Sequence, residues 1–382
     1  MSQSTLWTDD FLDQQRRRSD PLADEVVAQI VSQSGPEEAR KLFDLLIRRL
    51  ETPVSELPPV VGDFIQATRR LPAWTDWQQV DLAQGLFLDH GPKFLVVLYF
   101  KSLPLLYSCA HGAQVLVRTS RLTNEDRSLK IFARRIAETG QFLIDVMTAG
   151  GLRGGQGIQS IQKVRLIHAA IRHFVHREGW DAEQYGQPIN QEDMALTLMT
   201  FSIALIDALQ QWGIEEPPER LQAFLHTWTA IGHNMGVEDS LLPSSLEEGR
   251  LLMDRILQRQ SASSEAGQLL TRALTDFSRN LLPSDKLQAA PDAFIRYFIG
   301  EERAGMLGIA PNYGCLSFLG PQLLRSLFRL GERLEDKVEG PVSATLDLLS
   351  RRMALALVDL FNDYKGRTFR VPEAMERAWG VR

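Results

Sequence analysis

Three of the seven histidines lie within nine positions of one short segment, VRLIHAAIRHFVHREGW (164–180). Imidazole binds metal ions and transfers protons near neutral pH, so the positions of these three rings decide which chemistry is open to them. On a helix with about 100° per residue, His168 falls inside an apolar arc, His176 lies at the polar edge and His173 points toward solvent. The arc consists of Ile161, Val164, Ile167, Ile171, Phe174 and Val175. The three rings therefore do not converge, and a zinc site of the HExxH kind is not expected.

His168 stands alone in this apolar arc, with Arg165 and Arg172 on its polar edge. One interpretation is a core histidine satisfied by one hydrogen bond, because buried histidines are common. The other is an axial haem ligand, which needs an imidazole nitrogen reaching out of an apolar wall and cations near the haem propionates. Arg172, one turn after His168, has the position for such a cation, and Arg165 is a second candidate. The residues alone leave both interpretations open.

Helical periodicity runs through the whole chain and predicts an all-α fold that holds this segment in place. Apolar residues recur at helical spacing in 36–50, 124–147, 191–213, 273–282, 321–338 and 343–364. The apolar run FLVVLYF (94–100) has the composition of a buried strand, but no partner strand follows nearby.

The ends of two helices can be read from local signals. Gly150 and Gly151 are expected to end the helix over 124–147, and LRGGQG (152–157) is expected to be a flexible connector. Asn190 is the expected N-cap of the next long helix, with Glu192 and Asp193 in its first turn.

The chain is expected to form a single all-α domain over residues 1–382. SASSEAG (261–267) is the best linker candidate, but apolar helices resume directly after it. Within the domain we expect a core over 60–340, a helical N-terminal extension over 1–59, and a C-terminal helix and tail over 341–382.

Composition excludes several classes of protein. The 382 residues are 44% hydrophobic and 24% charged, which is ordinary for a globular protein with a sizeable core. A net charge of -6 argues against nucleic acid as a partner, and two cysteines exclude a disulfide framework. The amino terminus lacks the pattern of a signal peptide, and no apolar run is long enough to span a bilayer. We therefore expect a cytoplasmic protein without a transmembrane segment; the sequence does not determine its oligomeric state.

Three segments in a fixed order resemble the haem-dependent oxygenases typified by latex-clearing protein: SLPLLYSCAHGAQVLVRTSRLT (102–123), VRLIHAAIR (164–172) and GQPINQEDMALTLMTFS (186–202). That family includes rubber oxygenases and relatives of the fungal oxygenase that cuts a farnesyl side chain in mycophenolic acid biosynthesis. HTWTAIGHNMG (226–236) is similar to the family's Trp-containing helix. The resemblance implies globin-like helix packing around a non-covalently bound haem b.

Through this resemblance, His168 corresponds to the family's proximal iron ligand and Arg172 to the arginine one turn after it. Arg165 is assigned with them to cofactor binding, and Trp228 is expected to be a core residue near the haem.

The resemblance also identifies ARRIAETGQFLIDVM (133–147) as the distal helix. The rubber-cleaving members carry an Arg-x-x-Lys-Thr motif there. Arg135 and Thr139 match it, but Glu138 replaces the lysine that caps the iron in that group. A carboxylate does not donate as an ammonium does, so the iron ligation and the handling of oxygen are expected to differ, and cleavage of poly-isoprene is put in doubt.

These observations lead to the hypothesis of a haem b-dependent oxygenase that uses O2 on a hydrophobic, unsaturated substrate, isoprenoid- or alkene-like. Arg135, Glu138 and Thr139 would form the catalytic side, with Glu138 as base or polar orienter, and Phe142 and Leu143 would line a tunnel. In the reaction that the family implies, oxygen attacks an alkene carbon and scission of the carbon–carbon bond gives carbonyl products. One alternative is a non-catalytic haem-binding protein, such as a sensor, a carrier or a peroxidase-like scavenger. Another is a haem-free helical interaction protein on the same fold.

Overall fold

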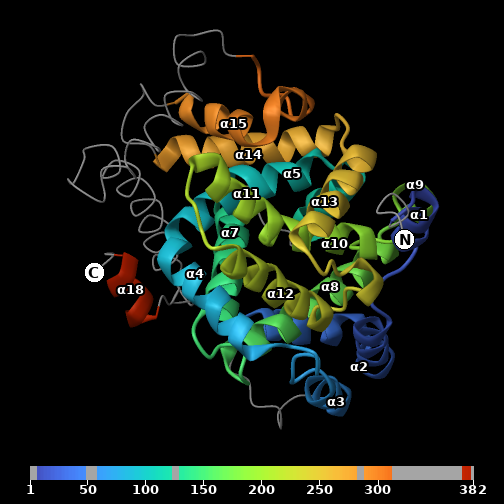
Figure 1. The fold of residues 1–382 in the computed structure, drawn as a ribbon. Coiled ribbons are helices and arrows are strands. Elements are labelled where there is room, and N and C mark those ends of the chain that lie inside the picture. Colours follow the sequence, from blue (N-terminus) through green and yellow to red (C-terminus); the bar gives the residue numbers. More distant parts are fainter. Residues whose placement is uncertain (1–6, 49–57, 123–128, 282–287, 312–371, 380–382) are drawn as a thin grey trace.

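The computed structural model describes residues 7–48, 58–122, 129–281, 288–311 and 372–379, and within these ranges the chain is helical and has no β-strand (Figure 1). An isolated antiparallel bridge joins Cys109 to Ser261. The prediction of a single all-α domain is confirmed, and the FLVVLYF run lies in a helix. The helices predicted over 321–338 and 343–364 fall outside the described residues.

The first half of the chain forms the helices up to Met147. Its helices are α1 (Asp9–Arg16), α2 (Pro21–Arg48), α3 (Pro59–Ala67), α4 (Trp77–Val97), the π-helix η3 (Leu98–Ser102), α5 (Leu103–Ser108), α6 (Ala110–Leu122) and α7 (Leu129–Met147).

The second half adds the helix that carries His168 and most of the helices that form the core. They are α8 (Gln156–Arg177), α9 (Ala182–Tyr185), α10 (Gln191–Phe201), α11 (Ile203–Trp212), α12 (Pro218–Asn234), the 3₁₀ helix η4 (Asp239–Leu241), α13 (Leu246–Gln260), α14 (Glu265–Leu281), α15 (Ala290–Met306) and α18 (Glu373–Trp379).

The long helix predicted over 191–213 is two helices, because the backbone leaves helical geometry at Ser202 (φ -118°, ψ -78°). The Ser202 hydroxyl donates to the Leu198 carbonyl, a back-bond that bends helices. The Ser102 hydroxyl donates to the Thr200 carbonyl at 2.7 Å and so satisfies a backbone acceptor near the break. Period 3.6 continues on both sides of the break, so the apolar pattern alone did not reveal it.

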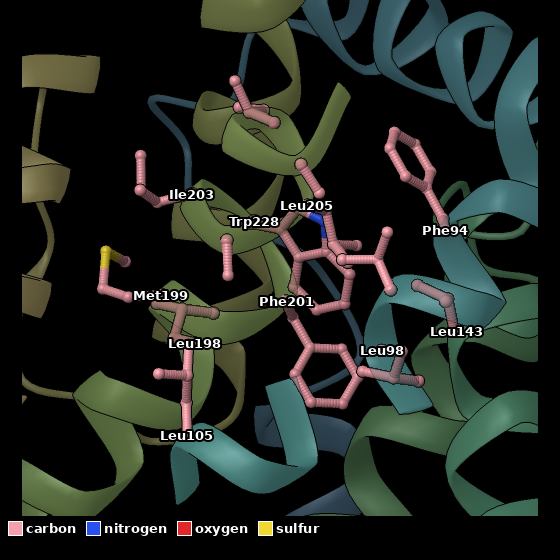
Figure 2. Packing of buried hydrophobic residues seen from close by; sticks show 14 of the residues in the cluster. Phe94, Leu98, Leu105, Leu143, Leu198, Met199, Phe201, Ile203, Leu205 and Trp228 are labelled. Carbon is pink, nitrogen blue, oxygen red and sulfur yellow. The ribbon is translucent and has the colours of Figure 1, made fainter. Parts of the chain in front are cut away.

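The helices are arranged in layers around a core formed mainly by α4, α10, α11 and α12 (Figure 1). Helices α14 and α15 pack on α5 at one end, and α2 and α3 pack on α8 at the other. Figure 2 shows the centre of this core, where Trp228 and Phe201 lie among leucines and Met199. In the part of the chain that the structure describes, no helix is both long and apolar enough to cross a membrane.

Candidate active site

His168 lies on a face of α8 that the neighbouring helices leave partly uncovered. Val164, Ile167, His168 and Ile171, at positions i, i+3, i+4 and i+7, are all half-buried; we refer to them as the His168 stripe. On the other side of α8, Leu166, Ala169 and Ala170 pack against α2 and α3 in a separate apolar cluster. The ring of His168 therefore sits in an apolar strip that the rest of the described core does not fill.

The His168 ring makes no hydrogen bond to any residue in the described ranges, and its Nδ1 atom is buried. Among the described residues, therefore, no partner supplies the one hydrogen bond that a satisfied core histidine would have. Burial, together with the positive charge of Arg172, lowers the pKa of His168 to about 4, and the negative charge of Asp20 opposes this only in part. At neutral pH the ring is uncharged, the form in which imidazole coordinates a metal ion. The chemistry of this side chain fits an axial haem ligand.

The sequence placed Arg165 and Arg172 at the polar edge of α8, but both are buried and ion-paired to the beginning of α2. The Arg165 guanidinium donates to Asp20 at 2.5 Å and 2.8 Å and to the Asn234 carbonyl at 3.0 Å. Its three nitrogens are therefore all engaged. The helical wheel did not reveal these ion pairs, because their acidic partners lie more than a hundred residues earlier in the chain.

Arg172 differs from Arg165 because one of its nitrogens has no partner among the described residues. Its Nε donates to Asp24 at 2.6 Å and its Nη1 to the Ile189 carbonyl at 3.3 Å, while its Nη2 is buried without an acceptor. A buried guanidinium N–H without an acceptor is costly, and an anionic group of a ligand would satisfy it. Of the two arginines predicted to bind a cofactor, Arg172 is therefore the one whose guanidinium can donate a hydrogen bond to a ligand, through its Nη2.

The other two histidines of α8 do not join His168. His176 is exposed and contacts Gln187 at 2.7 Å. His173 is half-buried rather than turned to solvent as predicted, with its Nε2 buried and its ring edge-on to Phe174 at 5.4 Å. Within the described ranges, no group of three or more His, Cys, Asp or Glu side chains could hold a metal ion.

The predicted distal residues share one turn and a half of α7, where Arg135, Glu138 and Thr139 are all half-buried. Arg135 fastens α7 to α6, because its guanidinium donates to the Leu116 carbonyl at 3.0 Å and to the Thr119 hydroxyl at 2.8 Å. Thr139 donates to the Arg135 carbonyl of its own helix at 2.9 Å. No hydrogen bond or ion pair joins these three side chains to His168 across the described part of the chain. Their catalytic roles remain predictions.

Helix α7 and helix α8 form an antiparallel pair whose connection is tightly built. Asp145 on α7 accepts hydrogen bonds from the Ser160 hydroxyl on α8 and from Gln141 at 2.7 Å. A side chain at Gly157 would place its Cβ 2.8 Å from the Asp145 carbonyl oxygen, so only glycine allows the helices to meet here. The segment predicted to be a flexible connector is a tight turn, because its glycines serve close backbone approach.

Trp228 is buried in the centre of the core, as predicted, but its indole Nε1 has no hydrogen-bond acceptor in the described residues. Its ring packs against that of Phe201 (Figure 2), with 5.2 Å between the two centroids. The ring centroids of Phe224 and Phe142 lie 6.3 Å and 6.4 Å from that of Trp228. Leu143 was expected to line a tunnel with Phe142. Leu143 is fully buried in the core cluster and Phe142 is half-buried at the edge of that cluster, and the tunnel remains a prediction.

A buried charge network at the start of α10 was missed by sequence reasoning. Asn190 is the N-cap as predicted, and its side chain accepts from the Asp193 amide at 2.9 Å. Glu192, expected only as a first-turn acid, is completely buried and bonds Arg16 at 3.0 Å and Arg259 at 3.1 Å. The signal in the sequence was an acidic residue in the first turn of α10, on a side of the helix that the structure shows to be buried.

Comparison with known proteins relates this arrangement to oxygenases. A family model described as "ER-bound oxygenase mpaB/B'/Rubber oxygenase, catalytic domain" matches residues 94–329. The rubber oxygenase of Streptomyces sp. (strain K30) is 26% identical over 299 residues, which cover 76% of this chain and 70% of that protein. A solved structure of latex clearing protein in the closed state superposes with a TM-score of 0.73 at 24% identity and covers 90% of both chains.

Proposed function

Because the chain belongs to the family of ER-bound oxygenases of the mpaB type and rubber oxygenases, and is thus an oxygenase, we propose that its cofactor is haem b held by His168. The substrate class that we propose is a hydrophobic, unsaturated molecule, isoprenoid- or alkene-like. The reaction consumes one O2 for each carbon–carbon double bond and leaves a carbonyl group on each of the two carbons. When bound, the haem iron supplies the redox chemistry that makes oxygen reactive toward the alkene.

The single observation that carries the proposal is the state of His168. Its imidazole is neutral, its Nδ1 is buried, and neither nitrogen bonds to any described residue. The ring sits in the apolar His168 stripe, so water competes poorly for it. These features support ligation of an iron ion in a flat, apolar macrocycle better than a structural role.

Other residues have roles that follow from their contacts. The buried Nη2 of Arg172, which has no acceptor among the described residues, can donate to a haem propionate. The Arg165 guanidinium already donates to Asp20. On α7, the contacts with α6 hold Arg135 in place as a fixed cation, and Glu138 is the group that we propose to orient the substrate or accept a proton. The aromatic side chains around Trp228 exclude water from the adjacent core.

A haem-binding protein without turnover is the second candidate function. The observation that favours it is Glu138, which stands where the rubber-cleaving relatives carry a lysine. A carboxylate there gives bound oxygen no ammonium donor, a difference that suits a sensor or carrier.

Two measurements on purified protein test the proposal. The absorption spectrum, before and after reduction, is expected to contain a Soret band that is lost in His168→Ala and retained in His176→Ala, the matched variant of an exposed histidine on the same helix. Oxygen uptake and carbonyl formation are then measured with a long-chain alkene or isoprenoid, with Arg135→Ala expected to lose both. A colourless protein that takes up no added haem would refute the cofactor, and haem binding without oxygen uptake would favour the second candidate.

A further inference from the structure

The N-terminal helix α2 contacts α8 on the flank that adjoins His168. With about 100° per residue, Arg165 and Arg172 lie only about 40–60° around the helix from His168. Asp20 and Asp24, one turn apart at the beginning of α2, each pair with one of these arginines. The two ion pairs thus bracket the histidine along the helix axis, three residues before it and four residues after it.

The pair nearer the start of α8 is enclosed by a third helix. Gly236, just after α12, has a φ of +86°, and a Cβ there would lie 2.6 Å from Asp20 Oδ2 and 2.9 Å from Arg165 Nε. Asn234 at the end of the same helix accepts from Arg165 at 3.0 Å. This close approach accounts for the glycine at the end of the HTWTAIGHNMG segment. It also means that α2, α8 and α12 meet at a single ion pair.

Burying the charges of Arg165, Asp20 and Arg172 carries a substantial desolvation free energy. The side chains of Arg165 and Asp20 are 10% and 3% exposed, and that of Arg172 is 4% exposed. A buried ion pair is weak evidence for stability, because well-packed apolar residues often do as well, but it fixes the register of the elements that it joins. Apolar contacts between Leu166, Ala169, Ala170 and α2 permit rotation of α8 more readily than two directional ion pairs do.

We propose that Asp20 and Asp24 are positioning residues for His168: their ion pairs with Arg165 and Arg172 fix the rotation of α8, and their carboxylates make the surroundings of His168 less positive. This inference rests on the proposed function for its second half. The first half, that α2 sets the position of α8, concerns the chain alone.

The experiment compares Asp20→Asn, Asp24→Asn and Gly236→Ala with wild type and with Asp13→Asn. Asp13 is the matched control. It lies on the N-terminal helix α1, pairs with Arg259 and is largely exposed. Hydrogen exchange of the α8 amides is measured on protein without added haem. We expect exchange in α8 to rise about tenfold in the first three variants and to stay at the wild-type rate in Asp13→Asn.

The haem-loaded protein gives a second readout that a purely structural role would not produce. In the loaded protein, loss of either carboxylate would make the surroundings of His168 more positive, so Asp20→Asn and Asp24→Asn should shift the midpoint reduction potential to more positive values. Asp24→Glu keeps the charge and should restore the wild-type potential, and Gly236→Ala changes the geometry without changing the charge.

The outcomes separate the two proposals. Wild-type exchange in both Asp20→Asn and Asp24→Asn overturns the positioning role, whether or not haem binds. If wild type takes up no haem, the proposed function fails, and the exchange measurement still decides the role of α2. A potential that is the same in Asp24→Asn and Asp13→Asn overturns the electrostatic half. If Asp20→Asn does not fold, Asp24→Asn carries the test, because Asp24 is the more exposed partner.

Discussion

Replacing Asp145 with alanine should loosen the pairing of α7 with α8 and lower the free energy of unfolding by about 2–3 kcal/mol. The carboxylate accepts from Ser160 across the helix pair and from Gln141 along α7. Truncation takes the acceptor away from the buried Ser160 hydroxyl, and a buried donor left unsatisfied costs about 1–3 kcal/mol.

Urea unfolding at pH 7, with protein free of haem, measures this loss directly. The matched control is Asp81→Ala, which breaks the exposed ion pair with Arg153 near the same end of the α7–α8 turn. Since exposed pairs contribute little, that variant should lose less than about 1 kcal/mol. Equal losses in the two variants would refute the conclusion that Asp145 joins the helices.

The burial of Asp145 can also be tested through the pH dependence of the free energy of unfolding, measured for Asp145→Asn and wild type. Burial raises the pKa of Asp145 above its ordinary value of 3.8, which the hydrogen bonds from Ser160 and Gln141 only partly offset. A group with a raised folded-state pKa stabilises the protein fully below its unfolded pKa, and this contribution is lost as the pH rises through the folded pKa. Asparagine does not titrate, so the stability of Asp145→Asn relative to wild type should increase between pH 4 and pH 7. A difference that stays constant over that range would contradict the burial argument.

Three further variants test other parts of the account. Glu192→Ala should cost about 2–3 kcal/mol in urea unfolding because it removes a buried carboxylate that accepts from Arg16 and Arg259, whereas Glu238→Ala, at an exposed pair, should cost less than about 1 kcal/mol; equal costs would contradict the buried network. Trp228→Ala should cost about 3–5 kcal/mol and the half-exposed Trp74→Ala less than about 1 kcal/mol, again by urea unfolding. Glu138→Gln should lower the rate of carbonyl formation about a hundredfold and leave the Soret band unchanged; an unaltered rate would remove Glu138 from the chemistry.

Local patterns predicted much of the fold. Apolar periodicity located α7 and α8, and Asn190 was identified as an N-cap because capping depends on residues only three positions apart. The break at Ser202 was missed, since the apolar pattern continues through it.

The candidate site was predicted only in part, because its partners come from distant segments. Periodicity put His168 in an apolar strip, and the structure adds that its ring has no hydrogen bond in the described ranges. The ion pairs of Arg165 and Arg172 with α2 join residues 145 and 148 positions apart, and no helical wheel contains such partners. The roles of Arg135, Glu138 and Thr139 came from resemblance to the family and remain predictions.

Ligation of haem iron by His168 is the central claim, and chemical rescue tests it most directly. His168→Gly removes the imidazole from α8, and free imidazole can then enter the space that the side chain leaves. We predict that the absorption spectrum of the haem-loaded variant differs from that of wild type and returns to it when imidazole is added. A His168→Gly spectrum identical to that of wild type, before imidazole is added, would contradict the claim, because the iron would then be held by another group.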